Sequence, residues 1–138
     1  MRIELRWSWI EDETASTWDA TNCAYAFTDP ESDEILFIDV AFAATVRDCC
    51  EAARHEELWK QLRAIGIENV GVLVGMPRAE PEAPVTHHLL DDVVHLLVIE
   101  LEPIGNAAAA SSQPGRTDLE VQCSGEWPYE ESVFAAGS

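Results

Sequence analysis

Basic residues are scarce in this chain, and lysine occurs only once, at Lys60. The 138 residues include 26 aspartates and glutamates but only 8 lysines and arginines, which gives a formal net charge of −18. Affinity for polyphosphates and anionic membranes comes from clustered cations that displace counterions. The shortage of cations therefore opposes binding to DNA, RNA or a membrane surface and permits a basic protein as partner. The plainer alternative is that the acidity serves only solubility.

Long apolar runs and paired cysteines are also missing. The most apolar stretch, 93–99, contains His95 and is followed by Glu100, so it falls short of the roughly 20 residues of a membrane span. The N-terminus lacks the apolar region of a signal peptide. The four cysteines show no C-x-x-C spacing, which favours thiols packed in the core over a zinc knuckle. We expect a cytoplasmic protein with reduced thiols.

The length and the ordinary apolar content, 47% of residues, fit a single domain over residues 1–138. The composition changes after Asn106, where small residues dominate 107–115. We therefore expect a core over 22–106, followed by a linker and C-terminal tail over 107–138, with frayed residues at 132–138.

The hydrophobic pattern predicts an α+β fold, that is, mixed helices and strands around a small sheet. We expect a three-stranded sheet that starts with a β-hairpin and is flanked by three helices, with an N-terminal strand and a candidate C-terminal strand beside it. The apolar phase of 45–65 slips by one position near Arg54 and His55, which predicts two consecutive helices. The predicted strands are 2–10, 23–27, 35–40, 70–74 and 119–123, the third helix is 87–101, and the proline-rich 77–84 is a predicted loop.

Several landmarks follow one another in the middle of the chain. Tyr25 lies on the first strand of the predicted hairpin and Phe37-Ile38-Asp39 on the second. Arg47 follows Asp39 by eight residues, and His55 comes further along the helical region. The segment 98–106 contains Val-Ile, then Pro, then Asn. In this order and spacing, residues 22–106 resemble the GIY-YIG nuclease superfamily.

The resemblance implies hydrolysis of a phosphodiester in DNA with one divalent metal, Mg²⁺ or Mn²⁺. It places Tyr25, Phe37, Arg47 and His55 at the positions of the catalytic residues, and Asn106 at a binding position. The position of the metal-binding glutamate falls on His95, or on Asp92 if the helix is shifted to find an acid.

The departures from the family pattern fall on the reacting groups. Phe37 has the ring of a tyrosine without its hydroxyl. Asp39 replaces a glycine and adds a negative charge where a phosphate would approach. His95 is a poor ligand for magnesium, which prefers oxygen. The positions that build the scaffold persist, whereas those that would move protons or hold metal are largely replaced.

The predicted helical region holds the least acidic part of the chain. Arg47 and Arg54 are seven residues apart and share a helix face, which makes them a candidate anion-binding surface. The alternative is that both arginines form ordinary ion pairs with neighbouring acidic residues.

Three functions remain open at this point. The first is a degenerate GIY-YIG-like domain without nuclease activity and without a cofactor, which binds or regulates a basic partner. The second is a divergent metal-dependent endonuclease that uses Tyr25 and Arg47 with Asp39, Asp92 or His95 as metal ligands. In the third the resemblance is accidental, and the chain is a small acidic immunity protein or nucleic-acid mimic.

Overall fold

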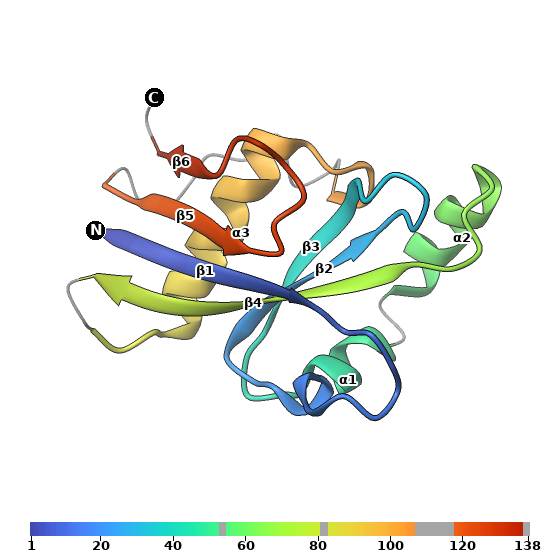
Figure 1. The fold of residues 1–138 in the computed structure, drawn as a ribbon, viewed down its shortest axis with the longest axis horizontal. Coiled ribbons are helices and arrows are strands. Elements are labelled where there is room, and N and C mark those ends of the chain that lie inside the picture. Colours follow the sequence, from blue (N-terminus) through green and yellow to red (C-terminus); the bar gives the residue numbers. More distant parts are fainter. Residues whose placement is uncertain (53–54, 81–82, 107–117, 137–138) are drawn as a thin grey trace.

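The computed structural model describes residues 1–52, 55–80, 83–106 and 118–136, and their strands form a single curled sheet (Figure 1). The order of the strands across the sheet is β3-β2-β4-β1-β5-β6. The elements are, in chain order, β1 (Arg2–Trp9), η1 (Ser16–Asp19), β2 (Cys23–Thr28), β3 (Ile35–Ala41), α1 (Val46–Cys50), α2 (Glu56–Ala64), β4 (Gly71–Glu80), α3 (His87–Leu101), η3 (Ile104–Asn106), β5 (Glu120–Gly125) and β6 (Val133–Ala135).

The mixture of helices and strands is confirmed, but the prediction of a three-stranded sheet is wrong, because the described residues form a sheet of six strands. The reason is the length of β4. Its first half, Gly71–Gly75, pairs with β2, and the stretch Leu73–Glu80 pairs with β1. Since β1 also pairs in parallel with β5, the N-terminal and C-terminal strands belong to the same sheet as the hairpin.

The loop predicted at 77–84 is wrong at its start, because β4 runs through Pro77 to Glu80. Pro77 lies opposite Leu5 of β1, and beyond Gly75 no described strand pairs with the other side of β4. Proline has no N–H to donate, so a strand tolerates it where one side carries no partner. The rule that proline interrupts strands therefore fails at this position.

The hairpin and the break between the two first helices are confirmed. β2 and β3 pair antiparallel, with Tyr25 opposite Asp39 and Phe27 opposite Phe37. α1 ends at Cys50 and α2 begins at Glu56. The strand predicted at 119–123 is also confirmed, as β5.

The predictions for the C-terminal tail have different outcomes. Residues 133–135 form β6, paired with β5, so the expectation of a frayed end is wrong for these residues. The predicted linker 107–115 and the last two residues, 137–138, lie outside the described residues.

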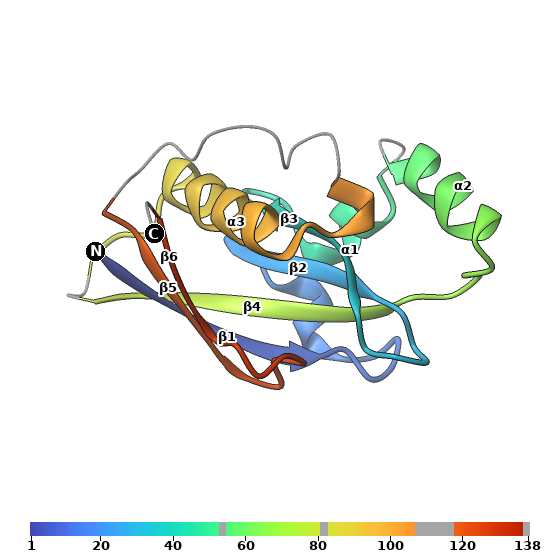
Figure 2. The same ribbon diagram turned by 90° about the horizontal axis from the view of Figure 1, so that it is seen from above.

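Helices cover both faces of β2, which lies between β3 and β4 and has all of its residues buried. Ala24 and Ala26 belong to the apolar cluster that contains most of α3. Tyr25 and Phe27 point to the opposite face, because side chains alternate along a strand, and they pack in a second cluster with residues of α1 and α2. Figure 2 shows α3 lying along the sheet. The sheet thus separates two cores.

The cysteines pack in these cores, as expected. Cys23, Cys49 and Cys123 are buried, and Cys50 is half-buried. Burial raises the pKa of Cys23, Cys50 and Cys123 to about 12, from an ordinary value of 9.0. Thiolates are the reactive form of cysteine, so the folded protein suppresses the reactivity of these three thiols.

We predict slow alkylation of the native protein by iodoacetamide at pH 8. A pKa raised to about 12 cuts the thiolate fraction about a thousandfold, and the higher intrinsic nucleophilicity of such a thiol returns part of this, so the native rate should be roughly a hundredfold below the rate in urea. Mass spectrometry of Cys23, Cys50 and Cys123 against time measures both rates. Equal rates in buffer and in urea would show that these thiols are not held in the core.

Candidate functional site

The phenol of Tyr25 lies inside the protein, against the ring of a buried histidine. Tyr25 is 0% exposed and His55 is 3% exposed. The Tyr25 Oη atom is 2.8 Å from Nε2 of His55 and 3.4 Å from Oδ2 of Asp39. The three side chains come from β2, β3 and the residue that precedes α2. This group, Tyr25, Asp39 and His55, is called the phenol cluster below.

The chemistry of the three groups limits how their protons are arranged. A carboxylate only accepts hydrogen bonds, whereas a phenol both donates and accepts. If Nε2 of His55 carries the proton, it donates to the Tyr25 oxygen, and the phenol donates to Asp39. If Nε2 is unprotonated, the phenol donates to the ring instead. In both arrangements the phenol proton is held within the cluster.

Aromatic rings surround the phenol cluster. The rings of Phe27 and Phe37 face each other across the hairpin at 5.6 Å, and Phe37 lies 5.0 Å from the His55 ring. Trp59 follows His55 by four residues and packs at 4.8 Å on Phe27. Cross-strand aromatic pairs stabilise a hairpin, and residues four apart share a helix face, so the local sequence explains this packing. Phe37 therefore has a structural role.

Asp39 is held by its own strand as well as by the phenol. Its Oδ1 atom accepts a hydrogen bond from the backbone N–H of Val40 at 2.8 Å. A carboxylate at this position places a negative charge beside the phenol, at the point where the resemblance expects glycine. An approaching phosphate would meet repulsion there.

A small pocket of about 290 Å³ opens beside the phenol cluster. Phe37, Asp39 and His55 line it together with Glu57, Gln61 and other residues of α2 and η3. Its charged lining side chains are acidic: Asp39 and Glu57. Sequence reasoning missed Glu57 and Gln61, because their contribution depends on how α2 lies across the hairpin, and no local motif encodes that.

Arg47 is not among the residues that line this pocket. Its guanidinium lies 5.3 Å above the ring of Trp18, and its Nη2 atom donates a weak hydrogen bond of 3.4 Å to the carbonyl of Glu13. Through these two contacts the Arg47 side chain connects α1 to the segment around η1. Arg54, the second predicted cation of this surface, lies outside the described residues.

Asp92 and His95 belong to α3, which covers the other face of β2. Because Tyr25 packs in the cluster of the opposite face, the sheet lies between these candidate metal ligands and the phenol. Asp92 is 6% exposed and lies 3.7 Å from His88, its neighbour on the helix. The structure does not bring the predicted metal ligands and the predicted catalytic residues together.

The described residues do not fit the divalent metal that the resemblance implies. No three His, Cys, Asp or Glu side chains in the described part of the chain are grouped so that they could hold an ion. Mg²⁺ usually binds through carboxylates and waters in octahedral geometry. We therefore assign no step of chemistry to a metal.

Asn106 completes the open edge of the hairpin. Its Oδ1 atom accepts from the backbone N–H of Ile38 at 2.8 Å, and its Nδ2 atom donates to the Ile38 carbonyl at 3.0 Å. The phenol of Tyr129 accepts from the N–H of Ile35 on the same strand at 2.8 Å. An unpaired strand edge attracts other strands, and these side chains satisfy it. Asn106, a predicted binding residue, is thus engaged with backbone.

No helix of the described residues is long and apolar enough to cross a bilayer.

The chain matches no family model, no curated protein and no solved structure.

We predict that Tyr25→Phe destabilises the protein more than Tyr129→Phe, although each variant loses one hydroxyl. Tyr25→Phe removes a hydrogen-bond partner of the buried His55 ring, which costs about 1–3 kcal/mol. Tyr129 is only partly buried, so its loss should cost about 1 kcal/mol or less. Urea unfolding followed by tryptophan fluorescence measures both. A smaller loss in Tyr25→Phe than in Tyr129→Phe would contradict a stabilising role for the buried pair.

Proposed function

We propose that this chain is a nuclease-like scaffold without nuclease activity that serves as a binding module for a basic protein. The observation that carries this proposal is the position of the Tyr25 phenol. It is fully buried and held by His55 and Asp39, so its hydroxyl does not reach a substrate at the surface. The remaining support comes from the arginine, from the metal ligands and from the charge of the surface.

Phosphodiester hydrolysis requires groups that activate water and stabilise the charge of the transition state. The guanidinium of Arg47 packs over the Trp18 ring and donates a hydrogen bond to the Glu13 carbonyl. Asp92 and His95 lie across the sheet from Tyr25. The groups that the chemistry would need are thus dispersed over two faces of the sheet, which supports a role without catalysis.

The surface supports a basic partner. The formal charge of −18 on 138 residues creates a negative potential that repels polyphosphates and accelerates the approach of cations. Because the pocket beside the phenol cluster is itself lined by Asp39 and Glu57, this potential extends to the position where the resemblance implies that a phosphate approaches.

One observation favours a second function, that of a divergent nuclease. A histidine 2.8 Å from a tyrosine hydroxyl is an arrangement that can move a proton. In this reading Tyr25 would act as a base that His55 activates, after a local opening exposes the pair. The next experiment separates the two functions.

We expect no cleavage of supercoiled plasmid or branched DNA in either Mg²⁺ or Mn²⁺, because the reacting groups are not assembled. Gel electrophoresis of the DNA measures nicking by the wild type, by Tyr25→Phe and by the matched control Tyr129→Phe. Any trace of nicking should be the same in all three. Cleavage by the wild type and by Tyr129→Phe that disappears in a folded Tyr25→Phe variant would establish the second function.

We also expect the wild type to bind a short fluorescein-labelled peptide of alternating lysine and leucine. Fluorescence anisotropy measures the dissociation constant, which should rise with salt because screening weakens the attraction. The control is a peptide in which glutamate replaces each lysine, and it should not bind. If the lysine peptide fails to bind at low salt, the proposal that this chain binds a basic protein is contradicted.

A further inference from the structure

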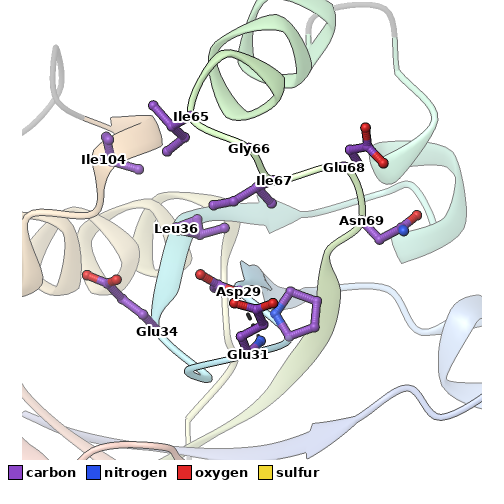
Figure 3. Close-up of a pocket in the computed structure, with 11 residues that line it drawn as sticks. Asp29, Glu31, Glu34, Leu36, Ile65, Gly66, Ile67, Glu68, Asn69 and Ile104 are labelled. Carbon is purple, nitrogen blue, oxygen red and sulfur yellow. Dashed lines mark hydrogen bonds between the residues drawn. The ribbon is translucent and has the colours of Figure 1, made fainter.

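A second hollow in the described surface is larger than the one beside the phenol cluster, and none of Tyr25, Asp39 and His55 lines it. It is a pocket of about 550 Å³ formed by the turn between β2 and β3, the connection between α2 and β4, and η3. Its volume falls in the ordinary range of ligand pockets, about 300–1,000 Å³. Figure 3 shows the residues that line it.

Apolar side chains form one part of this pocket. Leu36 lies at the base, 3% exposed, with Ile67 beside it. Ile65 is 56% exposed and Ile104 is 53% exposed, and in Figure 3 these two lie near each other at one rim. Two of the five large hydrophobic side chains that are exposed among the described residues thus meet at one hollow. Exposed apolar groups gathered in this way indicate a binding surface.

Carboxylates form another part of the lining. Asp29, Glu31, Glu34 and Glu68 line the pocket, and no lysine, arginine or histidine is among the described residues that do so. The backbone of the turn holds its part of the rim in place. Asp29 donates from its N–H to the Glu34 carbonyl at 2.9 Å, and the Asp29 carboxylate accepts from the N–H of Glu31 at 2.9 Å. Glu31, Glu34 and Glu68 are exposed.

This combination selects one kind of occupant. Lysine and arginine carry an apolar stem that packs on hydrophobic side chains and a charged head that stays at the polar rim. A nucleic acid or an acidic peptide would bring negative charge to four carboxylates. A purely apolar segment would leave those carboxylates without any compensating charge.

We infer that this pocket is the docking site for the basic partner, and that it receives a segment in which a lysine or arginine stands beside an apolar residue. The apolar side chain and the stem of the cation pack on Leu36, Ile65 and Ile104. The cationic head meets the carboxylates of Glu31, Glu34 and Glu68. This inference rests on the proposed function and adds to it the place of binding and the chemistry of the bound segment.

The test compares two variants that remove the same charge. One combines Glu31→Gln, Glu34→Gln and Glu68→Gln at the pocket. The other combines Glu11→Gln, Glu13→Gln and Glu51→Gln, three exposed residues that do not line it. Anisotropy with the lysine and leucine peptide at physiological salt measures binding. We expect at least a tenfold weaker affinity for the pocket variant and less than about a threefold change for the control, because charges beyond the Debye length of about 8 Å are screened.

One further double variant tests the apolar part without changing the charge. Ile65→Ser with Ile104→Ser should weaken the lysine and leucine peptide severalfold. A peptide of alternating lysine and glycine should be weakened less, because it loses only the contacts of its lysine stems. Circular dichroism checks that every variant is folded, which is expected because the replaced side chains are exposed.

The outcomes separate the two proposals. If the wild type binds the lysine peptide and both charge variants weaken it equally, binding is diffuse and the pocket is excluded, while the binding function stands. If the serine variant binds both peptides as the wild type does, the apolar contact is excluded. If the wild type does not bind, the proposed function itself fails.

Discussion

The hydrogen bond between Tyr25 and His55 is the constraint on which the functional interpretation depends. A histidine ring that is 97% buried must be satisfied by polar partners, because an unsatisfied buried polar group costs about 1–3 kcal/mol. The phenol of Tyr25, on β2, is a hydrogen-bond partner of the His55 ring, and the ring of Phe37, on β3, packs against it. A hydroxyl that holds the core together in this way is kept from the surface, where a substrate would approach. The same contact connects the start of α2 to the hairpin. The pocket of about 550 Å³, called the acidic pocket here, lies at the turn of that hairpin.

The sequence predicted the parts of the fold that local patterns determine. Two short apolar runs located the hairpin around Tyr25 and Phe37, and the slip in helical phase located the break before α2. The size of the sheet was not predictable in this way, because it depends on β4 continuing past Pro77 alongside β1. Sequence rules treat proline as a strand breaker because it lacks an N–H. Whether a strand tolerates proline depends instead on whether a neighbouring strand needs that N–H, which the sequence does not show.

The site shows the same division. The spacing of the motif residues led to Tyr25, Phe37 and His55, and these three do lie together. The spacing did not predict that α3 covers the opposite face, which separates Asp92 and His95 from them. The acidic pocket was missed because its parts are far apart in sequence. Its two exposed isoleucines were not recognisable from the sequence, because Ile65 continues the apolar spacing of a helix and Ile104 follows a proline.

Nuclear magnetic resonance of the Tyr25 hydroxyl tests the central claim most directly. A phenol proton that is buried and hydrogen-bonded exchanges slowly with water, so it should give a distinct resonance at neutral pH. That resonance should show a nuclear Overhauser effect to the His55 ring, and it should be absent in Tyr25→Phe. A hydroxyl that exchanges too fast to be seen, with no contact to His55, would mean that the phenol is open to solvent and would contradict the account.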